Sequence, residues 1–107
     1  MDITRIQSLV RSRQYVYSLH ADLELKAENL TFAQVRSALI NGTILEQYPD
    51  TGRGESCLIV GLADDLPLHI VCGWWGEKMV IITAYIPRLP KFVDPWTRVE
   101  RKKNDEQ

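Results

Sequence analysis

The chain has 107 residues, of which 45% are hydrophobic and 25% charged, with a formal net charge of -1; these values are typical of a globular protein and exclude wholesale disorder. No apolar run reaches the roughly 18 residues of a membrane helix, and the N-terminal stretch MDITRIQSLVRSRQ lacks the apolar segment of a signal peptide. We therefore expect no membrane partner and a single cytoplasmic α+β domain over residues 1–101, followed by a charged tail at 102–107.

Two helices are expected in the first thirty residues. Asp2 can cap a helix at about 3–13, where apolar residues recur at helical spacing. The stretch YVYSLH is expected to be extended. In the following stretch, ADLELKAEN, strong helix formers predict a second helix with an apolar stripe from Leu19 to Leu30, although the alternation of leucines there also fits a strand.

A third helix has clearer boundaries. Thr31 and Gln34 have the spacing of a capping box, and Phe32 and Leu39 fall on one face of the helix that would follow. Gly42 is expected to end this helix, because glycine accepts the left-handed backbone found just past a helix.

From Thr43 onward the hydrophobic period changes to two. The stretches TILEQY, CLIVGL, LHIVCGWW and MVIITAYI are separated by turn residues and predict a four-stranded antiparallel meander. Two to three N-terminal helices would cover one face of this sheet. Beyond Pro87 the sequence has no clear period, so we expect an irregular C-terminal strap with Trp96 as its large anchor.

Side-chain alternation sorts the last two strands into an apolar and a polar face, because successive residues of a strand point to opposite sides. A three-residue turn at 76–78 would pair His69 with Tyr85, and a five-residue loop at 63–67 would set Gly61 opposite His69, leaving space above the imidazole. The residues then expected beneath the helices are Leu58, Val60, Leu62, Leu68, Ile70, Cys72, Trp74, Val80, Ile82, Ala84 and Ile86.

The same alternation places the two cysteines, Cys57 and Cys72, on opposite faces of the sheet. A disulfide between them is therefore not expected, and both are predicted to be reduced thiols, as is usual in the cytoplasm.

The polar face carries the candidate chemistry. His69, Thr83 and Tyr85 would lie within cross-strand reach of one another, and His20 follows the extended segment, where its side chain could lean over the sheet. Histidines supply or accept protons near neutral pH, tyrosine donates a proton, and an arginine such as Arg53 neutralises phosphate. These groups would suffice for metal-free cleavage of RNA, although a histidine and a tyrosine opposed across strands are also typical of simple packing.

Other chemistries have less support. No cofactor or metal is expected, because the two histidines and two cysteines lack ligand spacings such as C-x-x-C or H-E-x-x-H, and GRGE does not connect a strand to a helix as a phosphate loop does. The register of the strand at 43–48 remains open. If Leu45 faces the core, Glu46 and Tyr48 join the polar face and Glu46 becomes another candidate base; in the opposite register they do not.

Several of these stretches together resemble a known family. SLHA followed by a helix, ILEQYP, CLIVGLADDLPLHIV and VIITAYIP, with a downstream tryptophan and basic residues, are similar over about residues 15–101 to the bacterial and cyanobacterial domain of unknown function 4258. That family is similar to the RelE and BrnT group of small toxins, so the resemblance implies helices packed on an antiparallel sheet. The residues that match the family's motifs are His20, Tyr48, Gly61, Pro67, His69, Thr83, Tyr85, Pro87 and Trp96.

The resemblance also implies a function: a toxin-type, metal-independent endoribonuclease that acts on RNA and is neutralised by a small antitoxin protein encoded nearby. His20 or His69 would be the base, and Tyr85 or the other histidine the acid. Phosphate and substrate would be held by Arg53, Arg101, Tyr48 and Thr83. The helix after His20 departs from the family in having acids and Lys26 where an arginine is common. The alternative is a non-catalytic module that binds a protein partner through Trp75, Tyr48 and the strap.

Overall fold

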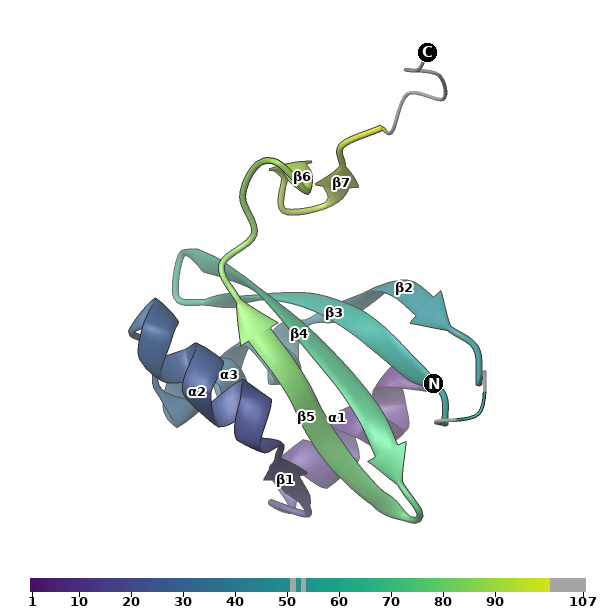
Figure 1. The fold of residues 1–107 in the computed structure, drawn as a ribbon. Helices are drawn as coiled ribbons and strands as arrows, with labels where there is room; N and C mark the ends of the chain where they lie inside the picture. The colour runs from purple at the N-terminus through teal and green to yellow at the C-terminus, as the bar shows by residue number, and fades with distance from the viewer. Residues whose placement is uncertain (51, 53, 101–107) are drawn as a thin grey trace.

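The computed structural model describes residues 1–50, 52 and 54–100, and it has an α+β fold. Figure 1 shows the three helices on one side of a sheet and a small hairpin of two further strands on the other. In chain order the elements are α1 (Ile3–Arg11), β1 (Tyr15–Tyr17), α2 (Leu19–Glu28), α3 (Phe32–Asn41), β2 (Thr43–Tyr48), β3 (Ser56–Ala63), β4 (Leu66–Trp75), β5 (Lys78–Tyr85), β6 (Phe92–Asp94) and β7 (Thr97–Arg98).

The main sheet has five strands in the order β1-β5-β4-β3-β2. Strands β2 to β5 form the predicted antiparallel meander. The prediction was incomplete, however, because β1 adds to the far edge and runs parallel to β5, which makes the sheet mixed. Sequence pattern alone assigned YVY an extended conformation but not a strand partner, since its partner lies far along the chain.

The helix starts follow the predicted caps. The Asp2 side chain accepts a hydrogen bond from the Thr4 amide, and both halves of the capping box between Thr31 and Gln34 are formed. Ser18 caps α2 and also donates from its hydroxyl to the carbonyl of Ile82 in β5, which fixes how α2 lies on the sheet.

Two details of the predicted helices were wrong. The buried face of α2 is formed by Ala21 and Leu25, whereas Leu19 and Leu23 are exposed, because the Ser18 bonds to β5 set a different rotation of the helix. Gly42 ends α3 with an ordinary negative φ of -84°, not a left-handed one. Glycine is required there for space, since a Cβ would lie 2.7 Å from the carbonyl oxygen of Ala38.

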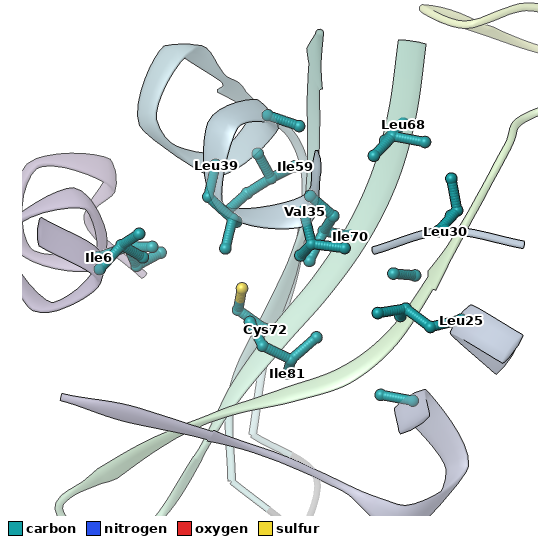
Figure 2. Packing of buried hydrophobic residues seen from close by; sticks show 14 of the residues in the cluster. Ile6, Leu25, Leu30, Val35, Leu39, Ile59, Leu68, Ile70, Cys72 and Ile81 are labelled. Atoms are coloured by element: carbon teal, nitrogen blue, oxygen red, sulfur yellow. The ribbon is translucent and has the colours of Figure 1, made fainter. Parts of the chain in front are cut away.

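The core fills the space between the helices and one face of the sheet. Figure 2 shows side chains from α1, α2 and α3 meeting those of β3, β4 and β5. The buried residues of this cluster are Ile6, Val10, Ala21, Leu25, Leu30, Val35, Ala38, Leu39, Cys57, Ile59, Ala63, Leu68, Ile70, Cys72, Met79, Ile81 and Ala84.

The predicted register between β3 and β4 was wrong by one residue. The connection is a two-residue turn at Asp64-Asp65, so Val60 lies opposite His69 and Gly61 lies opposite Leu68. Asp64 adopts a φ of +56°, a conformation that aspartate tolerates better than most residues and that tight hairpins require. The odd residues of β3 therefore face the helices, and Leu58, Val60 and Leu62 face away from them, contrary to the expectation.

A bulge in β5 changes the faces a second time. Val71 pairs with Thr83 and Cys72 pairs with Ile81, so Ile82 is the extra residue. On the N-terminal side of the bulge, Met79 and Ile81 enter the core in place of the predicted Val80 and Ile82. The turn at Gly76-Glu77 is also one residue shorter than predicted, and the bulge compensates, so the predicted pairs of His69 with Tyr85 and of Ile70 with Ala84 are confirmed.

The prediction that the cysteines face opposite sides was also wrong. Cys57 and Cys72 are direct cross-strand partners, and both are free, buried thiols in the core. Burial raises the pKa of Cys57 to about 11 and raises that of Cys72 as well.

Because only the thiolate reacts with alkylating reagents, we expect neither thiol to be labelled by iodoacetamide in the native protein and both to be labelled in urea. Labelling in the native protein, followed by mass spectrometry, would contradict this packing.

Candidate functional site

The central residue of the candidate site is His69 on β4, which is fully buried on the sheet face away from the helices, here called the outer face. Its Nε2 atom lies 2.6 Å from the carbonyl oxygen of Pro95, and its Nδ1 atom lies 3.3 Å from the hydroxyl of Tyr85. A carbonyl only accepts hydrogen bonds, so Nε2 carries the proton. In the neutral ring Nδ1 is then the acceptor for the Tyr85 hydroxyl.

Burial sets the protonation state of this pair. Desolvation lowers the pKa of His69, against the opposing effects of the Pro95 carbonyl and the Glu46 carboxylate. Desolvation also raises the pKa of the Tyr85 hydroxyl. At neutral pH the two groups are therefore an uncharged imidazole and an intact phenol, joined by one hydrogen bond.

An ion pair lies beside them. Arg98 donates to both carboxylate oxygens of Glu46, at 2.9 Å from Nε and 2.7 Å from Nη2, and the Tyr48 hydroxyl also donates to Glu46. These bonds hold the pKa of Glu46 below its ordinary value, the bond from Arg98 most strongly. Burial and the neighbouring carboxylate raise the pKa of Tyr48.

A second bulge, in β2, places Glu46 on the outer face. In the pairing of β2 with β3, Ile44 lies opposite Ile59 and Glu46 opposite Leu58, so Leu45 is the extra residue. Ile44 packs against the core and Glu46 faces outward. The structure has neither of the two registers left open by the sequence. Ile44 packs against the core in place of Leu45, and the bulge is what places Glu46 and Tyr48 on the polar face.

The C-terminal strap, residues 88–100, covers the outer face. Phe92 is its buried anchor, packed edge-on against the His69 ring at 4.4 Å between centroids, while the predicted anchor Trp96 is 54% exposed. The strap is also more regular than predicted, because β6 and β7 form a hairpin (Figure 1). At its start, Arg88 pairs with Glu28 at the end of α2 at 3.1 Å.

Tyr85 remains reachable from solvent beside the strap. A hollow of about 220 Å³ is lined by Tyr85, the strap residues Arg88 and Lys91, and the carboxylates of Glu24 and Glu28. Tyr85 is only partly buried, in contrast to His69. A ligand in this hollow would thus contact Tyr85, whereas His69 does not line it.

The structure brings together only part of the predicted site. His69, Tyr85 and Tyr48 lie in one cluster, and Thr83 shares the outer face opposite Val71. His20 is exposed in the first turn of α2, a helix that packs on the other face, so it does not join them.

Two of the predicted phosphate contacts, Arg53 and Arg101, lie outside the described residues. The cation that the structure supplies instead is Arg98, which the sequence analysis did not select. Its only sequence signal was its place among the basic residues of the strap, and nothing in the pattern indicated that the strap folds back onto Glu46.

The Glu46 to Arg98 pair predicts a specific response to acid. Because the folded pKa of Glu46 is lowered, its contribution to stability is present above its ordinary pKa of 4.5 and is lost as the pH falls through the folded value. Arg98 is half exposed, so this contribution is about 1 kcal/mol. We expect Glu46→Gln to lose about this much at pH 7 and to approach the wild type at pH 3, measured by urea unfolding. An equal deficit at both pH values would contradict the ion pair.

The fold and the site together define an α+β domain in which a C-terminal hairpin covers a polar cluster on the outer face of a mixed sheet. The family model described as a domain of unknown function (DUF4258) matches residues 17–86, and the chain therefore belongs to this family. Comparisons with curated proteins and with solved structures gave no match.

The described residues lack two kinds of feature. In residues 1–50, 52 and 54–100, no three histidine, cysteine, aspartate or glutamate side chains come together as a metal site would require. No helix in the same part of the chain has the length and apolar character needed to cross a membrane.

Proposed function

We propose that this protein is a toxin-type endoribonuclease that cleaves RNA without a metal, acts in the cytoplasm and is neutralised by a small antitoxin. The observation that carries the proposal is the chain of hydrogen bonds from Tyr85 through His69 to the Pro95 carbonyl, next to a guanidinium held in place by Glu46. A proton acceptor and a phosphate-binding cation in one cluster are the groups that such a cleavage needs. The resemblance to RelE-like toxins inferred from the sequence motifs implies the same class of reaction.

In the proposed reaction Tyr85 contacts the ribose and His69 acts through it. The Tyr85 oxygen accepts the proton of the 2′-hydroxyl while the Tyr85 proton passes to Nδ1 of His69. The 2′-oxygen then forms a bond to phosphorus, the bond from phosphorus to the 5′-oxygen breaks, and the 5′-oxygen takes a proton from water. The resulting imidazolium is stabilised by the Pro95 carbonyl and by Glu46, both of which favour its charged form. The hydroxide left from that water then takes the proton of the imidazolium through Tyr85, which restores the neutral pair. The products are a 2′,3′-cyclic phosphate and a 5′-hydroxyl end.

Arg98 can bind the phosphate while it keeps its hydrogen bonds to Glu46. Its Nε and one Nη2 hydrogen serve the carboxylate, and the guanidinium has five N–H donors in all, so three remain. It lies close enough to Tyr85 to oppose the rise in the pKa of that phenol. The same cation would therefore stabilise the phosphate. It opposes the positive charge on His69, which the Pro95 carbonyl and the Glu46 carboxylate favour.

The test uses the purified full chain and a mixed-sequence RNA in the presence of EDTA. We expect cleavage that leaves 5′-hydroxyl ends, and growth arrest on expression that is relieved by a small gene encoded next to this one. Intact RNA and unimpaired growth would remove the ribonuclease proposal.

A second candidate function is a protein-binding module without catalysis. The strap exposes the apolar side chains Leu89, Val93 and Trp96, each more than half accessible, and such a group of residues is typical of an interface. This reading predicts that Trp96→Ala abolishes binding of a partner protein recovered from the source cells, while RNA stays intact with both variants.

A further inference from the structure

A second cavity lies on the other side of the molecule, between α3 and the turn that precedes β1. Its volume is about 460 Å³, larger than that of the hollow beside Tyr85. It is lined by Arg13, Tyr15, Phe32, Ala33, Arg36, Ser37, Ile40 and Asn41. The predicted catalytic cluster contributes no residue to it.

The charges in this cavity are all of one sign. Arg13 and Arg36 are its ionisable cations, and no carboxylate lines it. Within the described part of the chain, neither guanidinium forms a salt bridge, although four other cationic groups do. The Nε atom of Arg36 is buried and has no hydrogen-bond partner there. A buried donor without a partner is costly, and the two guanidinium groups that line the cavity without a carboxylate partner would favour an anionic ligand there.

The aromatic side chains supply a flat apolar surface. Phe32, the first residue of α3, is 57% exposed, whereas Leu39, predicted to share its helix face, is buried. Its ring packs against Tyr17 at 4.7 Å between centroids, and Tyr17 in turn neighbours Tyr15, so the ring is supported from behind. An exposed ring held by other rings is suited to stacking on a nucleobase.

We propose that this cavity binds a nucleotide, with Arg13 and Arg36 on the phosphate and with Phe32 and Tyr15 against the base. Ser37 adds a hydroxyl for the ribose or the base edge. Asn41 can only accept there, because both of its amide hydrogens are donated to the Ser37 and Leu62 carbonyls. The site goes beyond the proposed cleavage and does not depend on it, because a mononucleotide has no internal phosphodiester to cleave.

The occupant can be a free nucleotide or one unit of a single strand. A neighbouring hollow of about 370 Å³ shares Arg13 and Tyr15 with this cavity and adds Lys78 together with the acidic Glu77. A second phosphate would meet Lys78 there, as expected for a groove that follows a nucleic-acid backbone. The nucleotide in the larger cavity would make the same contacts whether it is free or part of a single strand.

The binding test titrates the full chain with adenosine 5′-monophosphate, adenosine and inorganic phosphate by calorimetry. We expect the nucleotide to bind about tenfold more tightly than either part alone, because it engages the cations and the rings together. Arg36→Gln and Phe32→Ala should each weaken nucleotide binding about tenfold. Arg5→Gln is the matched control, since it removes the same charge from a residue that stacks on Trp74 and lines neither hollow.

Both variants alter partly exposed side chains, and circular dichroism checks that they are folded. If they are folded and bind the nucleotide as well as the wild type, or if the wild type shows no saturable binding, the assignment is overturned.

A 2′-O-methyl adenylate trimer, which cannot be cleaved through its 2′-oxygen, distinguishes a free nucleotide from a single strand as the occupant. Displacement of the mononucleotide by the trimer supports a strand, and failure to displace it supports a free nucleotide. If the wild type binds the nucleotide but does not cleave RNA, the proposed function is wrong and the nucleotide site stands.

Discussion

Replacing Gly61 by alanine is expected to lower the free energy of unfolding by about 3 kcal/mol and the melting temperature by roughly 15 °C. A Cβ at this position of β3 would lie 1.9 Å from the carbonyl oxygen of Ala38 and 2.7 Å from its carbonyl carbon. These are backbone atoms in the middle of α3, so the clash can be relieved only by moving the helix that carries Val35 and Leu39 into the core.

Gly73→Ala is the matched control for this prediction, because Gly73 is also a strand glycine of the same sheet. Its Cβ would meet the Cδ1 atom of Ile82 at 2.7 Å, which is the end of a flexible side chain. We expect a loss of less than about 1 kcal/mol, since a rotamer change relieves the contact. Thermal unfolding of the two variants measures the difference, and equal stability would show that α3 does not pack this closely on β3.

Replacing Tyr85 by phenylalanine is expected to reduce RNA cleavage about 100-fold or more. The substitution keeps the ring that packs on His69 at 5.3 Å between centroids, and it removes the hydroxyl that would take the proton from the ribose. His69→Gln should cause a comparable loss, although the imidazole itself is buried, because Tyr85 would then have no acceptor for its own proton.

Tyr17→Phe provides the control with the same chemical change. The Tyr17 hydroxyl is buried and has no partner among the described residues, so its removal should leave cleavage unchanged and stability equal or slightly higher.

The pH dependence of cleavage gives a further test. Because burial lowers the pKa of His69, the acidic limb of the rate profile should lie below pH 6.5, its ordinary value. Cleavage by Tyr85→Phe at the wild-type rate would exclude Tyr85 from the reaction.

The parts of the fold that sequence predicted well depend on neighbours in the chain. The capping box at Thr31 and the cap at Asp2 need only residues two or three positions away, and both are confirmed. The pairing of His69 with Tyr85 is also confirmed, but it resulted from two compensating errors: the turn at Gly76 is shorter than predicted, and the bulge at Ile82 restores the register.

The parts that failed depend on contacts that no local pattern encodes. Bulges at Leu45 and Ile82 shift the alternation within a strand, and an apolar alternation reads the same with or without them. The turn at Asp64-Asp65 did carry a signal, since two residues that tolerate positive φ are typical of a tight hairpin. For Arg98 there was no such signal, because its partner Glu46 lies in a distant strand.

The candidate site was therefore predicted in its centre and not at its edges. His69 and Tyr85 follow from the alternation of two adjacent strands, whereas His20 depended on where a helix would place an exposed side chain. The helix start at Ser18 is bonded to Ile81 and Ile82 in β5, and these bonds keep α2 on the face opposite to His69. The position of His20 therefore depends on a tertiary contact, which a local sequence pattern does not encode.

The parallel pairing of β1 with β5 has a consequence for how the chain reaches its native state. Tyr15 pairs with Met79, so the first strand has no partner until nearly the whole domain has left the ribosome. Contacts so distant along the chain close a large loop and slow the folding reaction. The hairpins of β2 to β5 should form first, and attachment of β1 should be a late step, visible as late protection of the Tyr15–Tyr17 amides in pulsed hydrogen exchange.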